Sequence, residues 1–164
     1  MKLELKFDNL PPMFRNHSHM PRNNMIIKTP MARAFEEEMS MRLFEIDPAI
    51  IKEFNKAYKK DKHYIINLTI ISAPSEILWT QKNTIDQHSG DWDAHKCYFD
   101  CIFKHIGIDD SQAMDNHIFK RESDDNNWNF YTTLIIRERN LSKGLEQWTT
   151  LTSILSTDKY LNLI

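Results

Sequence analysis

Five aspartates fall between Gly90 and Gln112, a stretch that holds two of the chain's three glycines. They form a D-x-D pair, a single residue and an adjacent pair, at Asp91 and Asp93, Asp100, and Asp109 and Asp110. Carboxylate oxygens are ligands that Mg²⁺ prefers, and such ions activate water and stabilise the leaving oxygen in phosphodiester hydrolysis. Aspartates at helix ends also cap helices, compensate the helix dipole or form turns. Spacing alone leaves both interpretations open.

A helix must lie between the two pairs of aspartates. Apolar residues recur at helical spacing through Tyr98, Phe99, Ile102, Phe103 and Ile106, so the pattern predicts a helix over 92–106. Gly107 is a natural C-cap. A β-branched, apolar run at 64–72 predicts a central strand before this helix, and 112–120 predicts a strand after it.

The remaining elements complete an α+β pattern. Residues 2–8 alternate as a strand, whereas 9–28 lack periodicity and predict a long loop. Thr29-Pro30 predicts the start of a helix, Asp47-Pro48 a break before a second, shorter helix, and 128–137 a strand. We therefore expect one α+β domain over 1–140, with a small mixed or antiparallel sheet and packed helices. A C-terminal helical extension is expected over 141–164.

Composition limits the class of protein. The chain has 164 residues, 41% of them hydrophobic, and four tryptophans, which is enough for a buried core. No apolar run approaches the roughly 20 residues of a membrane span. The two cysteines, Cys97 and Cys101, cannot build a disulfide framework, so we expect a soluble, cytoplasmic protein. Together with His105 they recur every four residues, but three helical positions span about 12 Å, too far for one zinc ion.

Charge is distributed unevenly along the chain. Residues 1–35 carry six basic and two acidic residues, whereas 86–127 carry four basic and ten acidic residues. A basic segment beside an acidic one suits a polyanion together with the cations it requires. Residues of the basic segment that could contact phosphates are Arg15, Arg22, Lys28 and Arg33.

The order of the motifs resembles one nuclease family. Asp91-Trp92-Asp93 is followed by Lys96 one turn into the helix, then by Phe99-Asp100 and by the sequence GIDDSQ at 107–112. Leu10-Pro11-Pro12, Asn16 and the segment TPMARAFEEEM at 29–39 precede them. Over about 3–138 this arrangement resembles the RusA-type Holliday-junction resolvases. Two departures are Ala94, where the family usually has Asn, and Lys96, which falls three residues after Asp93 instead of four.

The resemblance implies a crossover junction endodeoxyribonuclease. Such an enzyme is a homodimeric, Mg²⁺-dependent hydrolase, with Mn²⁺ as a possible substitute, that resolves four-way DNA junctions by paired nicks in recombination and repair. The implied metal ligands are Asp91, Asp93 and Asp110. Lys96 would contact the scissile phosphate or stabilise developing charge, and Asp109 would support the site. The implied DNA-binding residues are Arg15, Asn16, Arg22, Lys28 and Arg33.

Two alternatives stay open. The shortened spacing before Lys96 suits a non-catalytic, dimeric branched-DNA-binding protein of the same fold. The acidic residues would also suit a metal-binding interaction protein unrelated to DNA.

Helix length raises a geometric problem for the implied site. The helix between Asp93 and Gly107 spans roughly 18–20 Å, so carboxylates at its two ends cannot share an ion across a straight helix. Either the loop after Gly107 folds back along the helix, or a partner subunit supplies the second carboxylate. Our hypothesis from the sequence is a composite site, in which Asp110 of one chain meets Asp91 and Asp93 of the other.

Overall fold

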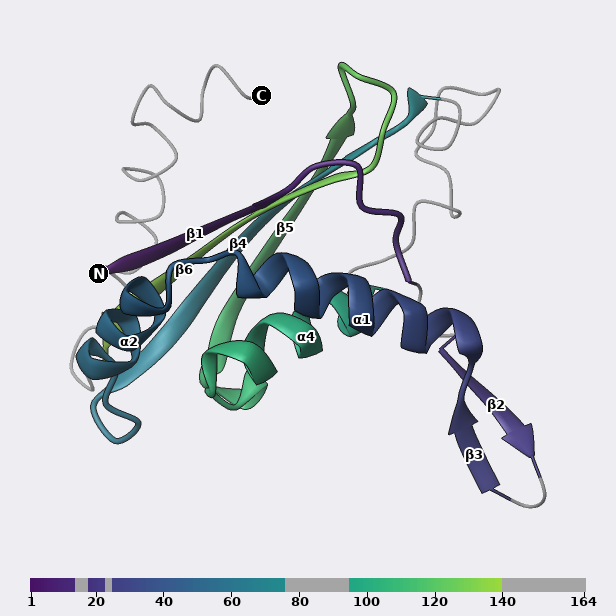
Figure 1. Ribbon diagram of the computed structural model, residues 1–164. Helices are drawn as coiled ribbons and strands as arrows, with labels where there is room; N and C mark the ends of the chain where they lie inside the picture. The colour runs from purple at the N-terminus through teal and green to yellow at the C-terminus, as the bar shows by residue number, and fades with distance from the viewer. Residues whose placement is uncertain (14–17, 23–24, 76–94, 140–164) are drawn as a thin grey trace.

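A four-stranded mixed sheet organises the computed structural model, which describes residues 1–13, 18–22, 25–75 and 95–139 (Figure 1). The strand order is β1-β6-β4-β5, with bounds Lys2–Phe7, Asn129–Glu138, His63–Ala73 and Ala113–Glu122. β6 is antiparallel to both β1 and β4, whereas β4 and β5 are parallel. Parallel neighbours require a crossover connection, and helix α4 (Lys96–Ile106) lies on it. The expected α+β domain is confirmed.

The helices cover one face of the sheet. Helices α1 (Pro30–Phe44) and α4 lie in front of the strands, and α2 (Pro48–Ala57) packs near the start of β1 (Figure 1). The core between these layers holds alternate residues of the strands and the apolar stripes of α1 and α4. From α4 it takes the residues of the predicted stripe, Tyr98, Phe99, Ile102, Phe103 and Ile106. One face of α4 is therefore fixed against the sheet and the other meets solvent.

The helix boundaries follow the local signals in the sequence. Thr29 is the N-cap of α1, and its hydroxyl accepts a hydrogen bond from the Ala32 N–H at 3.1 Å. Asp47 caps α2 in the same way, with its carboxylate 2.8 Å from the Ala49 N–H. Each helix has proline in its first turn, where the missing N–H costs nothing. The predicted break at Asp47-Pro48 is confirmed.

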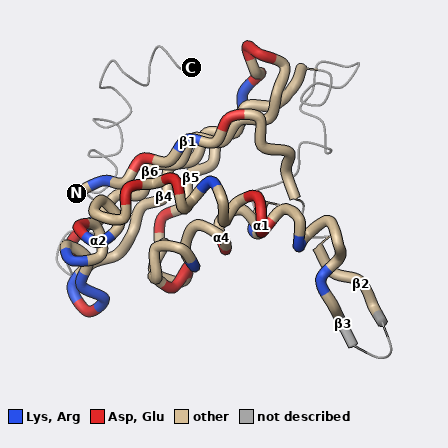
Figure 2. Tube along the Cα trace, viewed as in Figure 1, with Lys and Arg blue, Asp and Glu red and all other residues tan. Residues whose placement is uncertain are grey.

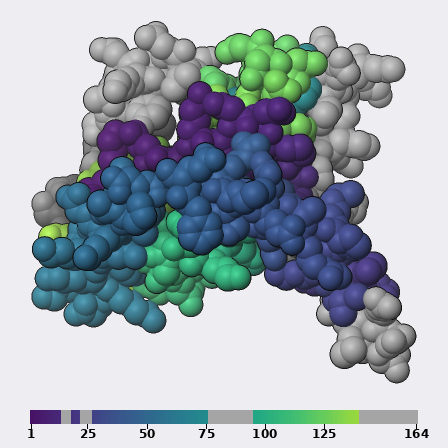
Figure 3. Space-filling model, in the orientation of Figure 1, coloured from purple at the N-terminus to yellow at the C-terminus, as the bar shows by residue number. Residues whose placement is uncertain are grey.

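The prediction of one long loop over 9–28 was wrong for residues 19–28. This segment contains an antiparallel pair, β2 (His19–Arg22) and β3 (Met25–Lys28). The pair projects away from the body of the molecule, beyond the end of α1 that begins at Pro30 (Figures 1 and 3). Pro21 masked the pattern, because proline breaks a strand signal; in a two-stranded sheet every strand is an edge and tolerates it. The expected extension over 141–164 lies outside the described residues.

No helix in the described ranges has both the length and the apolar composition of a membrane span.

A chain of buried hydrogen bonds joins α4 to the sheet. The Tyr98 hydroxyl bonds the Thr132 hydroxyl of β6 at 2.9 Å, and Thr132 bonds Thr69 of β4 at 2.9 Å. Thr69 donates to the Asn67 side-chain oxygen at 2.8 Å, and the Asn67 amide donates to Asn116 of β5 at 3.1 Å. Burial raises the pKa of Tyr98, which stays neutral. Because buried polar groups must be paired, this chain selects one position for α4.

Removing the hydroxyl at the head of this chain should destabilise the fold. We expect Tyr98→Phe to lower the free energy of unfolding by about 1–2 kcal/mol, because Thr132 loses one buried partner. Tyr131→Phe is a matched control, since the Tyr131 hydroxyl makes an exposed bond to Asp8 at 3.3 Å and should cost little. Urea denaturation of both variants measures the difference. Equal costs would contradict a structural role for the buried chain.

The turn between β5 and β6 holds a carboxylate in its charged form. The Asp125 side chain accepts bonds from the Ser123 hydroxyl at 2.5 Å, the Asn129 amide at 2.9 Å and the Asn127 N–H at 3.1 Å. These bonds lower the pKa of Asp125 from 3.8 to about 2. Asn129 also accepts from the Asn9 N–H at 2.8 Å, so the same turn anchors the chain after β1.

Acid should weaken this turn in a defined range of pH. Because folding lowers the pKa of Asp125, its contribution to stability is present above about pH 4 and is lost as the pH falls toward 2. We expect Asp125→Asn to flatten the pH dependence of the melting temperature between pH 4 and 2. Asp124→Asn removes a neighbouring charge outside these hydrogen bonds and should leave the dependence as in the wild type. Thermal melts at several pH values test this.

Candidate active site

Lys96 and Asp110 meet although they are 14 positions apart in the sequence. The Lys96 Nζ lies 2.6 Å from Asp110 Oδ2 and 2.9 Å from Asp100 Oδ1, one turn along α4. The exposed fraction of the side chain is 38% for Lys96, 47% for Asp110 and 51% for Asp100. Donating hydrogen bonds to Asp110 and then to Asp100 raises the pKa of the Lys96 amino group. The cluster therefore holds a fixed cation beside two solvent-accessible carboxylates.

The loop after α4 reaches Lys96 because it folds back along the helix. Gly107 ends α4 with φ at +70°, a left-handed conformation that reverses the chain and favours glycine. Ile108 continues inward and is buried. The single helical turn η4 (Asp110–Gln112) follows and leads into β5. The predicted C-cap at Gly107 is confirmed.

Residues remote in sequence anchor this loop. The Asn55 amide of α2 donates to the Ile106 carbonyl oxygen at 2.6 Å. The Gln112 side-chain oxygen accepts from the Tyr58 hydroxyl at 2.9 Å and from Arg139 at 3.0 Å. Sequence reasoning missed Asn55, Tyr58 and Arg139; the only available signal was that Gln112 belongs to the DDSQ motif. These contacts position Asp110 without using its carboxylate.

Asp109 has a structural task in the same loop. Its carboxylate caps η4 by accepting from the Ser111 N–H at 2.9 Å. The hydroxyl and the N–H of Ser111 lower the pKa of Asp109, so it stays ionised. The two adjacent aspartates therefore have different roles: Asp109 stabilises the turn, and Asp110 forms an ion pair with Lys96.

This geometry removes the argument for a composite site. The hypothesis rested on a helix too long to be spanned, but the loop returns along α4 and brings Asp110 to the helix start. Asp93 lies only three residues before Lys96 in the sequence. Asp91 and Asp93 themselves lie outside the described residues. Among the residues that are described, no three His, Cys, Asp or Glu side chains converge as a metal site.

A cavity of about 550 Å³ adjoins the cluster between α1, α4 and the base of the hairpin. Asp100 lines it and also binds Lys96, while Lys28 and Lys104 contribute positive charge. Lys28 pairs with Glu36, and Arg33 donates to the Lys28 carbonyl oxygen at 3.2 Å. Two of the predicted DNA-binding residues, Lys28 and Arg33, therefore lie together at the start of α1, and Lys28 lines the cavity.

The other predicted DNA-binding residues are not placed. Arg15 and Asn16 lie outside the described residues, and Arg22 is described only as the last residue of β2.

The cysteines face the same cavity as neutral thiols. Cys97 and Cys101 are free, and burial raises the pKa of Cys101 to about 12 and also raises that of Cys97. Cys97 and Cys101 lie on helix α4, as the helical spacing predicted.

The connection between α2 and β4 carries three lysines, and one of them, Lys60, lies near Asp109 in the loop after α4. Lys59, Lys60 and Lys62 are exposed in the connection between α2 and β4. Figure 2 shows them as a basic segment at the end of the sheet where the loop after α4 also lies. Lys60 contributes to the lowered pKa of Asp109, so the two loops are close. The sequence indicated only a solvated helix end here, because nothing local reveals which loop is adjacent.

No protein-family model matches the chain, and no curated protein matches it. The resemblance to RusA-type resolvases is therefore carried by the motif residues alone.

The ion pairs of Lys96 make a measurable prediction. Asp110→Asn should lower the pKa of the Lys96 amino group more than Asp100→Asn does, because the bond to Asp110 is the larger cause of its elevation. Each variant should change the free energy of unfolding by less than about 1 kcal/mol, since exposed ion pairs are screened. NMR titration of the lysine amino groups gives the pKa values. A pKa unchanged in Asp110→Asn would show that the loop does not fold back.

Proposed function

We propose that the chain is a cytoplasmic, Mg²⁺-dependent endonuclease of the RusA type that resolves four-way DNA junctions as a homodimer. The observation that carries the proposal is the contact between Lys96 and Asp110, a motif lysine and a motif aspartate joined at 2.6 Å. The sequence resemblance requires Lys96 and Asp110 to share one site. Nothing else in the sequence predicts that two residues 14 positions apart should meet.

The donor set suits a divalent cation. Asp110 offers exposed carboxylate oxygens, which are hard ligands, and one of them already binds the Lys96 ammonium. Asp110 would hold the ion together with Asp91 and Asp93 from the segment before α4. Bound Mg²⁺ supplies an activated water and neutralises charge on the phosphate.

The chain's own residues then have separate tasks. Lys96 carries a positive charge fixed by two carboxylates, and it can transfer one of these bonds to a phosphate oxygen as negative charge develops. The hydrogen bonds to Asp110 and Asp100 raise its pKa and so favour the charged form further. Asp109 holds the turn, and Asp100 orients Lys96 from the helix. Lys59, Lys60 and Lys62 lie where flanking backbone phosphates could be contacted.

Cleavage of a synthetic four-way junction tests the proposal. We expect paired nicks only when Mg²⁺ or Mn²⁺ is added. Asp110→Asn and Lys96→Met should each reduce the cleavage rate by at least about 100-fold, as expected for loss of a group that stabilises transition-state charge. Asp124→Asn is the matched control, because it makes the same change of charge in the turn between β5 and β6, outside the ion pairs of Lys96, and should keep a rate near that of the wild type.

Binding assays separate this function from its alternatives. Junction binding with no metal-dependent cutting, unchanged by Asp110→Asn, would support the non-catalytic branched-DNA-binding protein instead. Absence of any salt-sensitive affinity for DNA would contradict both functions.

A further inference from the structure

The cavity between α1 and α4 has no part in the proposed hydrolysis. Its volume of about 550 Å³ falls within the range of about 300–1,000 Å³ that is usual for small-molecule sites. Residues of both helices line it at helical spacing, and residues at the base of the β2–β3 hairpin complete it. The two helices lie side by side over this stretch (Figure 1). The cavity is therefore a groove between two helices that can accept a planar ring.

The wall of the cavity is largely apolar. Ala32 and Leu43, which are buried in the core, contribute side chains from α1. Cys97 and Cys101 contribute free thiols from α4, and burial raises the pKa of both, so these groups stay neutral. A free cysteine of this kind packs as a small apolar side chain. Such a wall suits the flat faces of an aromatic ligand.

The charged residues of the lining balance one another. Lys28 and Lys104 line the cavity together with Glu36 and Asp100, so two positive charges face two negative ones. Glu36 pairs with Lys28, and Asp100 pairs with Lys96. Each carboxylate still has acceptor sites for further N–H groups. The lining therefore favours an uncharged ring with polar edges over an anion.

An exposed aromatic ring stands at one end of the cavity. Phe44, the last residue of α1, lines the cavity and is 74% exposed. Its ring lies 5.5 Å from that of His105 at an interplanar angle of 89°, an edge-to-face contact that leaves ring surface open. Exposed aromatic rings of this kind serve as stacking platforms for unpaired bases.

The cavity is continuous with the candidate active site. Asp100 lines the cavity and lies 2.9 Å from the Lys96 Nζ, which lies 2.6 Å from Asp110. Along α4, the five residues from Asp100 to His105 correspond to about 7.5 Å, a distance comparable with the length of one nucleotide. A phosphate at Lys96 and a base beside Phe44 can therefore belong to the same nucleotide or to neighbours.

We propose that a nucleobase next to the scissile phosphate leaves its stack and enters the cavity between α1 and α4, where it stacks on Phe44. This inference rests on the proposed function, because it requires bound DNA. Extruding a base costs least where the base is already unpaired or poorly stacked. Binding of an extruded base would therefore favour the branch point of a junction over continuous duplex.

Junctions that lack a single base test the inference without cleavage. Binding is measured in EDTA by fluorescence anisotropy, on a complete junction and on junctions in which one abasic site is moved through the nucleotides around the branch point. We expect Phe44→Ala to weaken binding of the complete junction at least about fivefold, as for loss of one base–aromatic stack. The same variant should have no effect on the junction whose abasic site removes the stacked base.

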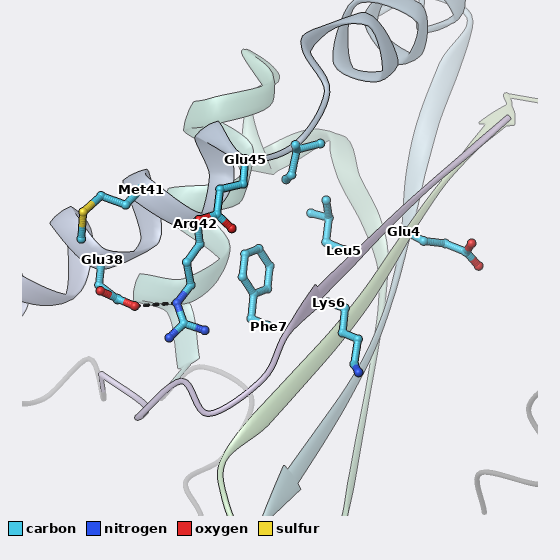
Figure 4. A pocket seen from close by; sticks show the side chains of 9 residues that line it. Glu4, Leu5, Lys6, Phe7, Glu38, Met41, Arg42 and Glu45 are labelled. Carbon is cyan, nitrogen blue, oxygen red and sulfur yellow. Dashed lines mark hydrogen bonds and ion pairs between the residues drawn. The ribbon is translucent and has the colours of Figure 1, made fainter.

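Met41→Ala is the matched control. Met41 lies one turn before Phe44 on α1 and is 60% exposed, but it lines a separate groove of about 490 Å³ beside β1 (Figure 4). The variant removes an exposed apolar side chain from the same helix and should bind every junction as the wild type does. Thermal melts confirm that both variants are folded.

The two cysteines of the chain, Cys97 and Cys101, give a second readout because both line the cavity. The complete junction should protect them from alkylation by N-ethylmaleimide, whereas the junction without the stacked base should leave them reactive. If Phe44→Ala weakens all junctions equally or none, or if the thiols react alike in both complexes, the inference is overturned although Mg²⁺-dependent cleavage persists. Absence of both junction binding and cleavage would overturn the proposed function as well.

Discussion

The buried chain of hydroxyls and amides from Tyr98 to Asn116 fixes how α4 sits on the sheet. If α4 shifted by one helical turn along the sheet, these groups would lose their hydrogen-bond partners, at a cost of about 1–3 kcal/mol each. Tyr98 and Lys96 are two residues apart, which on a helix places them on nearly opposite faces. The same bonds that bury Tyr98 therefore turn Lys96 toward solvent, where it can meet Asp110.

The candidate site depends on hydrogen bonds that hold the loop after α4 in place, and not on strands that end at one point. Gly107 reverses the chain, Asn55 holds the end of α4, and Tyr58 and Arg139 hold Gln112. None of these residues uses the Asp110 carboxylate, which leaves its oxygens for a cation. Exposed ion pairs contribute little to stability, so the cost of arranging Lys96 and Asp110 must be met by this scaffold.

The two edges of the sheet have different chemistry. β5 begins at the acidic loop and lies near the lysines that follow α2, whereas β1 presents alternating charges and an open groove. The lysines that follow α2 and the groove beside β1 therefore lie at opposite edges of the sheet.

The sequence by itself determined the local features of this protein. Thr29-Pro30, Asp47-Pro48 and Gly107 set helix ends through their own backbone chemistry. Alternation identified β1, and helical spacing identified the core stripe of α4. Only the tertiary structure decided that Asn67 and Thr69, inside an apolar strand, carry a polar chain, and that Asp110 returns to Lys96. Caps and periodicity act within a few residues. The approach of residues 14 apart depends on the angles of one loop and on anchors from distant elements, which no local pattern encodes.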